Sequence, residues 1–327
     1  MDSYVRNSSH FPPANDDWEK LDDRELVVAM AVYISLLSVS GFVGNILVIV
    51  SVAISPRLRT TSYAFIVNLS VADLAVNVLS IPLVVRSFLE YGWPHDPLWC
   101  RWVCYLFLMG IGVSLFTLTA VAASRYCLVA YPRRIYNRCC GMKAAGLIVA
   151  NNWFLSLLLA LIHHWGNFDG IRYIPSVRFC FLDAFDGVSY WYVSVAVVCI
   201  VCFILIPLLY CMTFRTLYVS QRRLHAARRR NAFARHRRQI LHPAEIKLTK
   251  MLAVIFLILL FCWTPIWVTH FVDTSPHFQR LGVMLVLTNS SVNPFVYAWL
   301  NEHFKRAFKR ILLCRRRHRA RVKPLIL

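Results

Sequence analysis

The acidic residue Asp73 lies in the middle of a long apolar run, where an ionised carboxylate is costly and has to face a polar or hydrated interior. Other apolar runs carry small oxygen-bearing side chains that could surround it: Asn45, Ser114, Asn289, Ser290 and Asn293. Because Asn289 and Asn293 are four residues apart, they share one face of a helix. Carboxylate, amide and hydroxyl oxygens suit hard cations. This set therefore favours a monovalent cation site, and the alternative is a hydrated polar network without an ion.

The apolar runs that carry these residues are long enough to cross a membrane. Apolar types make up 58% of the 327 residues and charged types 16%. A helix of about 20 apolar residues crosses the ~30 Å hydrocarbon core and satisfies its own backbone polar groups. We find seven such runs, at Leu26–Ile54, Tyr63–Leu89, Trp99–Ala130, Ala144–His164, Tyr190–Val219, Ile246–Phe271 and Leu281–Leu300. The sequence therefore predicts an all-α membrane protein with a seven-transmembrane helix bundle in residues 26–300.

The net charge of +20 is distributed unevenly along the chain. If the N-terminal tail, residues 1–25, is extracellular, most lysines and arginines fall on the cytoplasmic side and most acidic residues fall outside. Such an asymmetry fixes orientation, and basic segments also attract anionic membrane lipids. The basic charge is thus explained by topology, with partner docking as an overlapping role, and nucleic acid is not an expected partner. Asn7 begins a glycosylation sequon on the expected outer face.

Residues 301–327 form the basic cytoplasmic end of the chain. Phe304, Phe308, Ile311 and Leu312 fall on one helical face with lysines and arginines opposite, which predicts a short amphipathic eighth helix in the membrane interface. Cys314 ends this segment and is a candidate for palmitoylation. An unmodified cysteine at this position is the alternative.

Two of the eleven cysteines, Cys100 and Cys180, fall in outer positions where oxidation to a disulfide is expected. Cys104, near the outer end of the same predicted helix as Cys100, is a second candidate. Most other cysteines lie within the apolar runs, where small apolar side chains pack.

Each run also holds polar or helix-breaking residues that a passive membrane anchor would not need. In chain order they are Gly44-Asn45, Asn68 to Asp73, Ser124-Arg125-Tyr126, Trp153, Pro207, Cys262-Trp263-Thr264-Pro265 and Asn293-Pro294-Phe295-Val296-Tyr297. This ordered set, one group per run, resembles the rhodopsin-like (class A) G-protein-coupled receptors over essentially the whole chain. The resemblance implies a plasma-membrane receptor that binds an extracellular ligand and activates heterotrimeric G proteins by outward movement of the sixth helix, with arrestin as a further partner.

The resemblance also implies roles for single residues. Arg125, followed by Tyr126, matches the arginine that meets the G protein, and Glu245 is placed to pair with it across the third and sixth spans. Trp263 and Pro265 match the activation switch of span six, and Asn293, Pro294 and Tyr297 match that of span seven. The residues that match Asp73 and Ser114 line a sodium site that favours the inactive state.

Three positions depart from the family pattern. Ser124 replaces the acid that usually precedes the arginine, Leu259 replaces a phenylalanine, and Arg215 replaces the tyrosine of span five. From the loss of one partner for Arg125 we predict raised basal signalling.

The ligand pocket is expected in the outer half of the bundle. Phe107 stands where amine receptors carry an aspartate, which argues against a biogenic amine, and Leu287 stands where opsins bind retinal. The interior offers Phe107, Ile111, Trp263, Trp267 and His270, and Arg86, Arg172 and Arg178 are expected at its rim. An aromatic cavity with a basic rim suits a small acidic or amphipathic molecule, and a short peptide stays open. The segment from His164 to Phe181 is similar to the second outer loop of melatonin receptors, and spans five and six resemble that branch and related fatty-acid-like orphan receptors.

Other protein classes fit less well. A transporter needs polar residues along a continuous path, whereas strong polarity at mid-membrane is confined to the Asp73 group. An enzyme is not expected, because no metal-ligand cluster, nucleophile triad or phosphate-binding loop occurs outside the spans. The alternative that stays open is a heptahelical protein that binds ligand, or acts as a scaffold, without coupling to G proteins.

Overall fold

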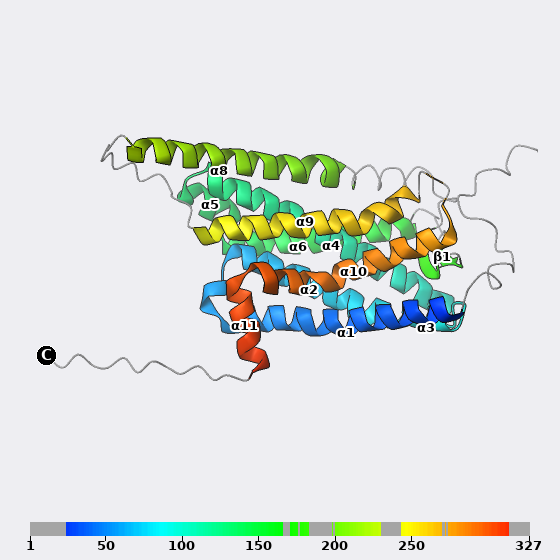
Figure 1. The fold of residues 1–327 in the computed structure, drawn as a ribbon. Coiled ribbons are helices and arrows are strands. Elements are labelled where there is room, and N and C mark those ends of the chain that lie inside the picture. Colours follow the sequence, from blue (N-terminus) through cyan, green and yellow to red (C-terminus); the bar gives the residue numbers. More distant parts are fainter. Residues whose placement is uncertain are drawn as a thin grey trace, which may run out of the picture.

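The computed structural model describes residues 24–165, 171–175, 177–182, 198, 200–229, 243–269, 272 and 274–313. Asn7, His270 and Cys314 lie outside the described residues. Within the described residues, seven helical segments are long and apolar enough to cross a membrane. They lie side by side as a bundle (Figure 1). The predicted seven-helix architecture is therefore confirmed.

The first three spans are α1 (Arg24–Ile54), the segment made of α2 (Thr61–Ala75), η3 (Val76–Ser80) and α3 (Ile81–Leu89), and α4 (Pro97–Ala130). The short helix η2 (Pro56–Leu58) joins α1 to α2. η3 is one turn of π-helix between α2 and α3. Asp96 caps α4, because its carboxylate accepts a hydrogen bond from the Leu98 amide at 2.8 Å and Pro97 needs no partner at the first position.

The remaining spans begin with α6 (Met142–Trp165), which follows the short helix α5 (Arg133–Cys140). The fifth span contains η4 (Ile200–Leu205) and α8 (Ile206–Arg229), the sixth is α9 (Pro243–Val268) and the seventh is α10 (Pro276–Leu300). The predicted start of span five, from Tyr190, lies outside the described residues. α9 begins three residues earlier than the run predicted from Ile246.

The amphipathic helix α11 (Glu302–Leu312) crosses the end of the bundle at a steep angle to the spans (Figure 1). Asn301 makes the turn possible, since its side-chain oxygen accepts from the His303 amide at 2.9 Å and its side-chain nitrogen donates to the Tyr63 hydroxyl at 3.1 Å. Phe304 and Phe308 are buried against the bundle. The predicted short eighth helix is therefore present.

The opposite end of the bundle carries a hairpin that the sequence analysis did not predict. β1 (Ile171–Ile174) pairs antiparallel with β2 (Phe179–Leu182), with Tyr173 opposite Cys180. Cys100 and Cys180 form a disulfide with Cα atoms 5.3 Å apart, which ties β2 to the first turn of α4. The end of the bundle with this hairpin is called the outer end below, and the end with α11 the inner end. The predicted pairing is confirmed, and Cys104 is buried and is not one of the two cysteines of this disulfide.

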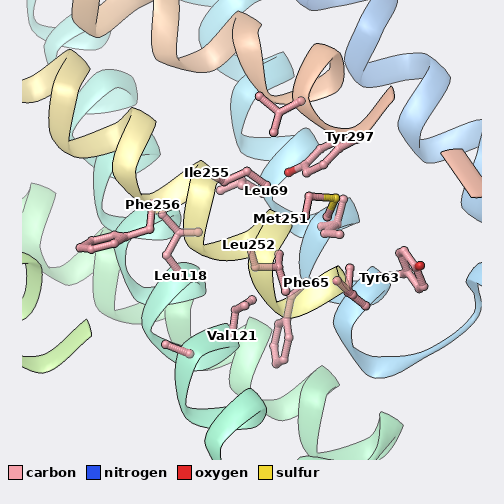
Figure 2. Packing of buried hydrophobic residues seen from close by; sticks show 14 of the residues in the cluster. Tyr63, Phe65, Leu69, Leu118, Val121, Met251, Leu252, Ile255, Phe256 and Tyr297 are labelled. Atoms are coloured by element: carbon pink, nitrogen blue, oxygen red, sulfur yellow. The ribbon is translucent and has the colours of Figure 1, made fainter. Parts of the chain in front are cut away.

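The apolar core of the inner half is formed where α2, α4, α9 and α10 meet. Figure 2 shows Leu69 of α2, Leu118 and Val121 of α4, Leu252 and Ile255 of α9, and Tyr297 of α10 converging in one layer. Beside it, Trp153 of α6 donates from its indole nitrogen to Asn68 Oδ1 at 2.7 Å, and Asn68 donates to Thr117 at 2.8 Å. These bonds fix α2, α4 and α6 relative to one another.

Candidate functional site: an outer cavity, a polar floor and an inner ion pair

A cavity opens between α4, α9, α10 and the start of the fifth span. It encloses about 720 Å³ of space free of protein atoms, part of it open to the outside. Its upper wall is aromatic and aliphatic and includes Phe107, Ile111, Trp263 and Trp267. Its floor contains Asp73, Ser114, Asn289 and Ser290. The structure thus joins part of the predicted ligand pocket and part of the predicted cation site in one continuous chamber.

Trp263 lies on the wall of this chamber and is in contact with α4. Its ring stacks on that of Phe107, with centroids 6.2 Å apart and an interplanar angle of 27°. Phe107 in turn meets Phe179 of β2 edge to face, with centroids 5.0 Å apart. Pro265 follows two residues later inside α9 and removes a donor from the helical hydrogen-bond ladder. A ligand in the chamber would therefore touch the segment at which α9 bends most readily.

The arginines predicted at the rim do not line the chamber. Arg178 is 4% exposed, and its guanidinium lies 4.5 Å from the centre of the Tyr91 ring and donates to the Phe88 carbonyl at 3.3 Å. It therefore fastens the hairpin to the end of α3. Arg86 pairs with Glu90 at 2.6 Å on the surface of α3. Arg172 is exposed on β1 and is absent from the described cavity wall.

The carboxylate of Asp73 is 2% exposed and is held from α10. Asn293 donates from Nδ2 to Asp73 Oδ2 at 2.9 Å, and Ser290 is a second hydrogen-bond partner. Asn45 does not contact the carboxylate; it donates to the carbonyls of Gly41 and Ser290. The predicted set is thus brought together, with Asn45 one step away as a support for α10. An oxygen-rich floor of this kind could bind a hard cation.

A second polar hub, which was not predicted from the sequence, is centred on Asn77 in η3. Asn77 donates to the carbonyls of Asp73 at 2.8 Å and Ser290 at 3.2 Å, and it accepts from Ser291 at 3.1 Å. Ser38 of α1 donates to its carbonyl at 2.8 Å. The signal was available, since Asn77 lies four residues after Asp73 on the same helical face. The hub joins α1, the second span and α10 one turn above the carboxylate.

The inner end of the bundle is joined by a charged pair between the third and sixth spans. Arg125 Nη1 donates to Glu245 Oε2 at 2.6 Å. The arginine side chain is 2% exposed, whereas the glutamate side chain is 30% exposed. Tyr126 points to Tyr131 instead, with ring centroids 6.2 Å apart. Glu245 therefore approaches the buried guanidinium of Arg125 from one side and neutralises its charge there.

Two tyrosines are buried in the apolar core of the bundle. Tyr297 is 0% exposed and stacks on Phe304, and its hydroxyl has no hydrogen-bond partner among the described residues. Tyr210 of α8 is also buried, stacks on Phe256 of α9 and likewise has an unpartnered hydroxyl in the described part of the chain. Arg215, which stands in the family's tyrosine position, is exposed.

Tyr210 could have been found from periodicity. Ile206, Tyr210, Thr213 and Leu217 are all buried and follow the spacing of one helical face. Arg215 lies off that face. The fifth span therefore keeps a buried tyrosine, although at a different position from the one expected.

Comparisons with known proteins agree with this geometry. The 7 transmembrane receptor (rhodopsin family) profile matches residues 44–297. The melatonin receptor type 1B of Rattus norvegicus is 28% identical over 284 residues, covering 83% of this chain and 74% of the receptor. The somatostatin receptor type 1 of Rattus norvegicus is 28% identical over 291 residues, covering 85% and 70%. The allatostatin-A receptor of Bombyx mori is 27% identical over 321 residues, covering 91% and 84%.

The fold comparison points the same way. The crystal structure of squid rhodopsin superposes with a TM-score of 0.75 at 17% identity and covers 95% of both chains. The predicted similarity to melatonin receptors is confirmed, and the somatostatin and allatostatin-A receptors match at comparable identity. With its seven apolar helices, the chain is a multi-pass plasma-membrane protein that belongs to the rhodopsin family of G-protein-coupled seven-transmembrane receptors.

Proposed function

We propose that this protein is a ligand-gated activator of heterotrimeric G proteins that is switched by release of Arg125 from Glu245. The observation that carries the proposal is this ion pair, a 2.6 Å contact on an arginine that is 1% exposed. It joins the inner ends of α4 and α9, and the cavity borders the same two helices farther out. Activation then consists of outward movement of the inner end of α9.

The proposed route begins at the cavity wall. A ligand that displaces Trp263 from Phe107 changes the bend of α9 at Pro265, since a proline inside a helix removes a ladder hydrogen bond and lowers the cost of bending. The bend pulls Glu245 away from Arg125. The freed guanidinium then needs new partners, and the unpartnered hydroxyl of Tyr210 lies within electrostatic range of it. Tyr297 supplies a second such hydroxyl from α10.

The cavity favours a ligand with an apolar body. Its described wall is built from aromatic and aliphatic side chains, and Asp73 on the floor is the charged group among the lining residues that the structure describes. A carboxylate on the ligand would therefore be repelled at the floor and tolerated only near the outer opening. We propose a small amphipathic molecule that enters with its apolar part first, and a short peptide could insert an apolar side chain in the same way.

The polar floor is proposed to bind a sodium ion. Asp73, Ser114 and Asn289 offer carboxylate, hydroxyl and amide oxygens, and Asn293 orients the carboxylate from α10. A cation there would hold the second, third and seventh spans together. Because the floor is continuous with the ligand chamber, the ion and a deeply seated ligand would compete for the same space, so the ion favours the inactive state.

Orientation and modification complete the proposal. The N-terminal tail is placed outside, where Asn7 is accessible for glycosylation, and Cys314 is placed beside the inner leaflet, where acylation is possible. The basic residues of α11 then face anionic membrane lipids: the exposed Lys305, Arg306 and Lys309 and the half-buried Arg310. Arrestin is proposed as a second cytoplasmic partner, at the surface opened by α9.

The experiment that tests the proposal is basal guanine-nucleotide exchange on a panel of Gα subtypes, with wild type compared with Arg125→Ala at matched surface expression. Exchange by the wild type that disappears in the variant supports coupling and names the Gα partner. Equal exchange in both forms would remove Arg125 from the mechanism.

The second candidate function is a heptahelical protein that binds ligand without coupling. Ser124 in place of an acid and an exposed Arg215 in place of a buried tyrosine favour it. Saturating ligand that binds but leaves every Gα subtype silent would support this alternative.

A further inference from the structure

A pair of cysteine thiols meets at the inner end of the third span, outside the machinery described above. Cys127 lies on α4 and Cys140 ends α5. Cys127 packs against the small apolar cluster of Leu128, Tyr136 and Cys140, and the Cys140 side chain interacts directly with that of Cys127. Both cysteines are free, Cys140 is 7% exposed and Cys127 is partly accessible.

The two thiols differ from the neighbouring Cys139 in where they point. Cys139 is exposed, whereas Cys140 turns inward to α4. In α5 the inward face also carries Tyr136, four residues before Cys140, so the helix periodicity holds Cys140 against Cys127. Two thiols in contact on separate helices can be oxidised to a disulfide, whereas alanine or valine in the same space could not.

We propose that Cys127 and Cys140 are a reversible disulfide site, formed when the protein meets a peroxide-class oxidant. The accessible Cys127 thiolate attacks one peroxide oxygen, so that an S–O bond forms, the O–O bond breaks and the second oxygen leaves as water after protonation. Cys140 sulfur then attacks the Cys127 sulfur, forming the S–S bond, and the S–O bond breaks to release a second water. The peroxide is reduced and the two thiols are oxidised.

The location makes this site suited to regulation. In the orientation proposed above, the pair faces the cytoplasm, where reducing systems keep thiols free, so a disulfide there is transient and is reversed by a dithiol of the thioredoxin type. Cys127 lies two residues after Arg125, so the bond would fasten α5 to the helix segment that carries the ion pair. A lowered rate of nucleotide exchange on oxidation follows from this placement and rests on the proposed function.

Disulfide mapping of the full-length purified receptor tests the site without any need for coupling. The receptor is treated with hydrogen peroxide, free thiols are blocked, and peptides are identified by mass spectrometry before and after thioredoxin treatment. We expect a Cys127–Cys140 linked peptide that thioredoxin removes, while Cys100–Cys180 stays linked. Because two thiols in contact have an effective concentration in the millimolar range, the intramolecular product should exceed receptor–receptor disulfides on the order of 10³-fold at micromolar receptor.

Matched variants define the pair. Cys139→Ser should keep the linked peptide, and Cys127→Ser and Cys140→Ser should each abolish it. Oxidation of Cys139 without a Cys127–Cys140 disulfide would overturn the proposal. A disulfide from Cys127 that is still found in Cys140→Ser would also overturn it. Wild-type mapping decides the question even if one variant folds poorly. A linked receptor with unchanged nucleotide exchange would contradict only the regulatory consequence, and absent exchange under reducing conditions would instead count against the proposed function.

Discussion

The outer and inner halves of the third span, α4, have opposite surroundings. From Phe107 to Ser114, α4 borders an open chamber with an aromatic wall and a polar floor. From Leu118 to Val121, it packs against α2 and α9 in a filled apolar layer (Figure 2), and the part-buried Arg125–Glu245 pair follows at its inner end. The outer half therefore borders open space, whereas the inner half is closed by packing and by the Arg125–Glu245 pair.

This difference follows from residue type rather than from helix geometry. The outer half is held in place from outside the chamber, by the Cys100–Cys180 disulfide and by Arg178 fastened to Tyr91. The inner half is held from within, by close packing and by the charge on Arg125. Changes that loosen the disulfide or the close packing should therefore lower stability, whereas loss of the charge pairing at Arg125 should change signalling.

The largest effect on the outer half is expected from Cys180→Ser. The disulfide closes a loop with a sequence separation of 80 residues, and removal of a native disulfide typically costs about 2–5 kcal/mol. Thermal unfolding of the purified receptor should show the loss. Cys211→Ser, which changes an exposed free cysteine of α8, is the control and should leave the melting temperature unchanged. Equal melting temperatures for all three proteins would show that the hairpin does not depend on the disulfide.

Close packing of the inner half predicts the next largest effect, at Gly44. A Cβ at this position would lie 2.7 Å from Pro294 Cβ, so Gly44→Ala should push α1 away from α10 and destabilise the bundle by about 1–3 kcal/mol. Gly146→Ala on α6 is matched to it, because a Cβ there meets no atom within 4 Å. That control should be neutral or slightly stabilising, since alanine favours helices. Indistinguishable melting curves for the two variants would disprove close packing between α1 and α10.

The polar floor, which lies between the halves, predicts a smaller and salt-specific effect. Sodium at ten times its Kd should add about 1.4 kcal/mol of stability, and each kcal/mol raises the melting temperature by about 2–4 °C. Asp73→Asn should abolish the rise, because it removes the charge but keeps the shape. Potassium chloride at equal ionic strength is the control. A shift of the same size with either salt, or one retained in the variant, would argue for a hydrated network without a bound ion.

The sequence predicted the spans well because their length and polarity are dictated by the bilayer itself. The sequence also placed Asp73, Arg125 and Glu245, because a charged side chain within or beside an apolar run has to face a polar or hydrated environment. It failed for the rim arginines, because the position of Arg178 depends on a hairpin and a ring contact between residues distant in the chain. Tyr210 was missed for a different reason: Arg215 was placed by resemblance rather than by the buried face of α8.

The measurement that tests the switch most directly is basal nucleotide exchange by Glu245→Gln, compared with Glu302→Gln at matched surface expression. Both substitutions remove one carboxylate, but Glu302 pairs with the exposed Arg306 at 3.8 Å, whereas Glu245 neutralises a buried arginine. If the ion pair holds the bundle closed, Glu245→Gln should raise exchange about tenfold, equivalent to about 1.4 kcal/mol, and Glu302→Gln should match the wild type. Unchanged exchange in Glu245→Gln, with wild-type exchange that is measurable, would contradict the switch.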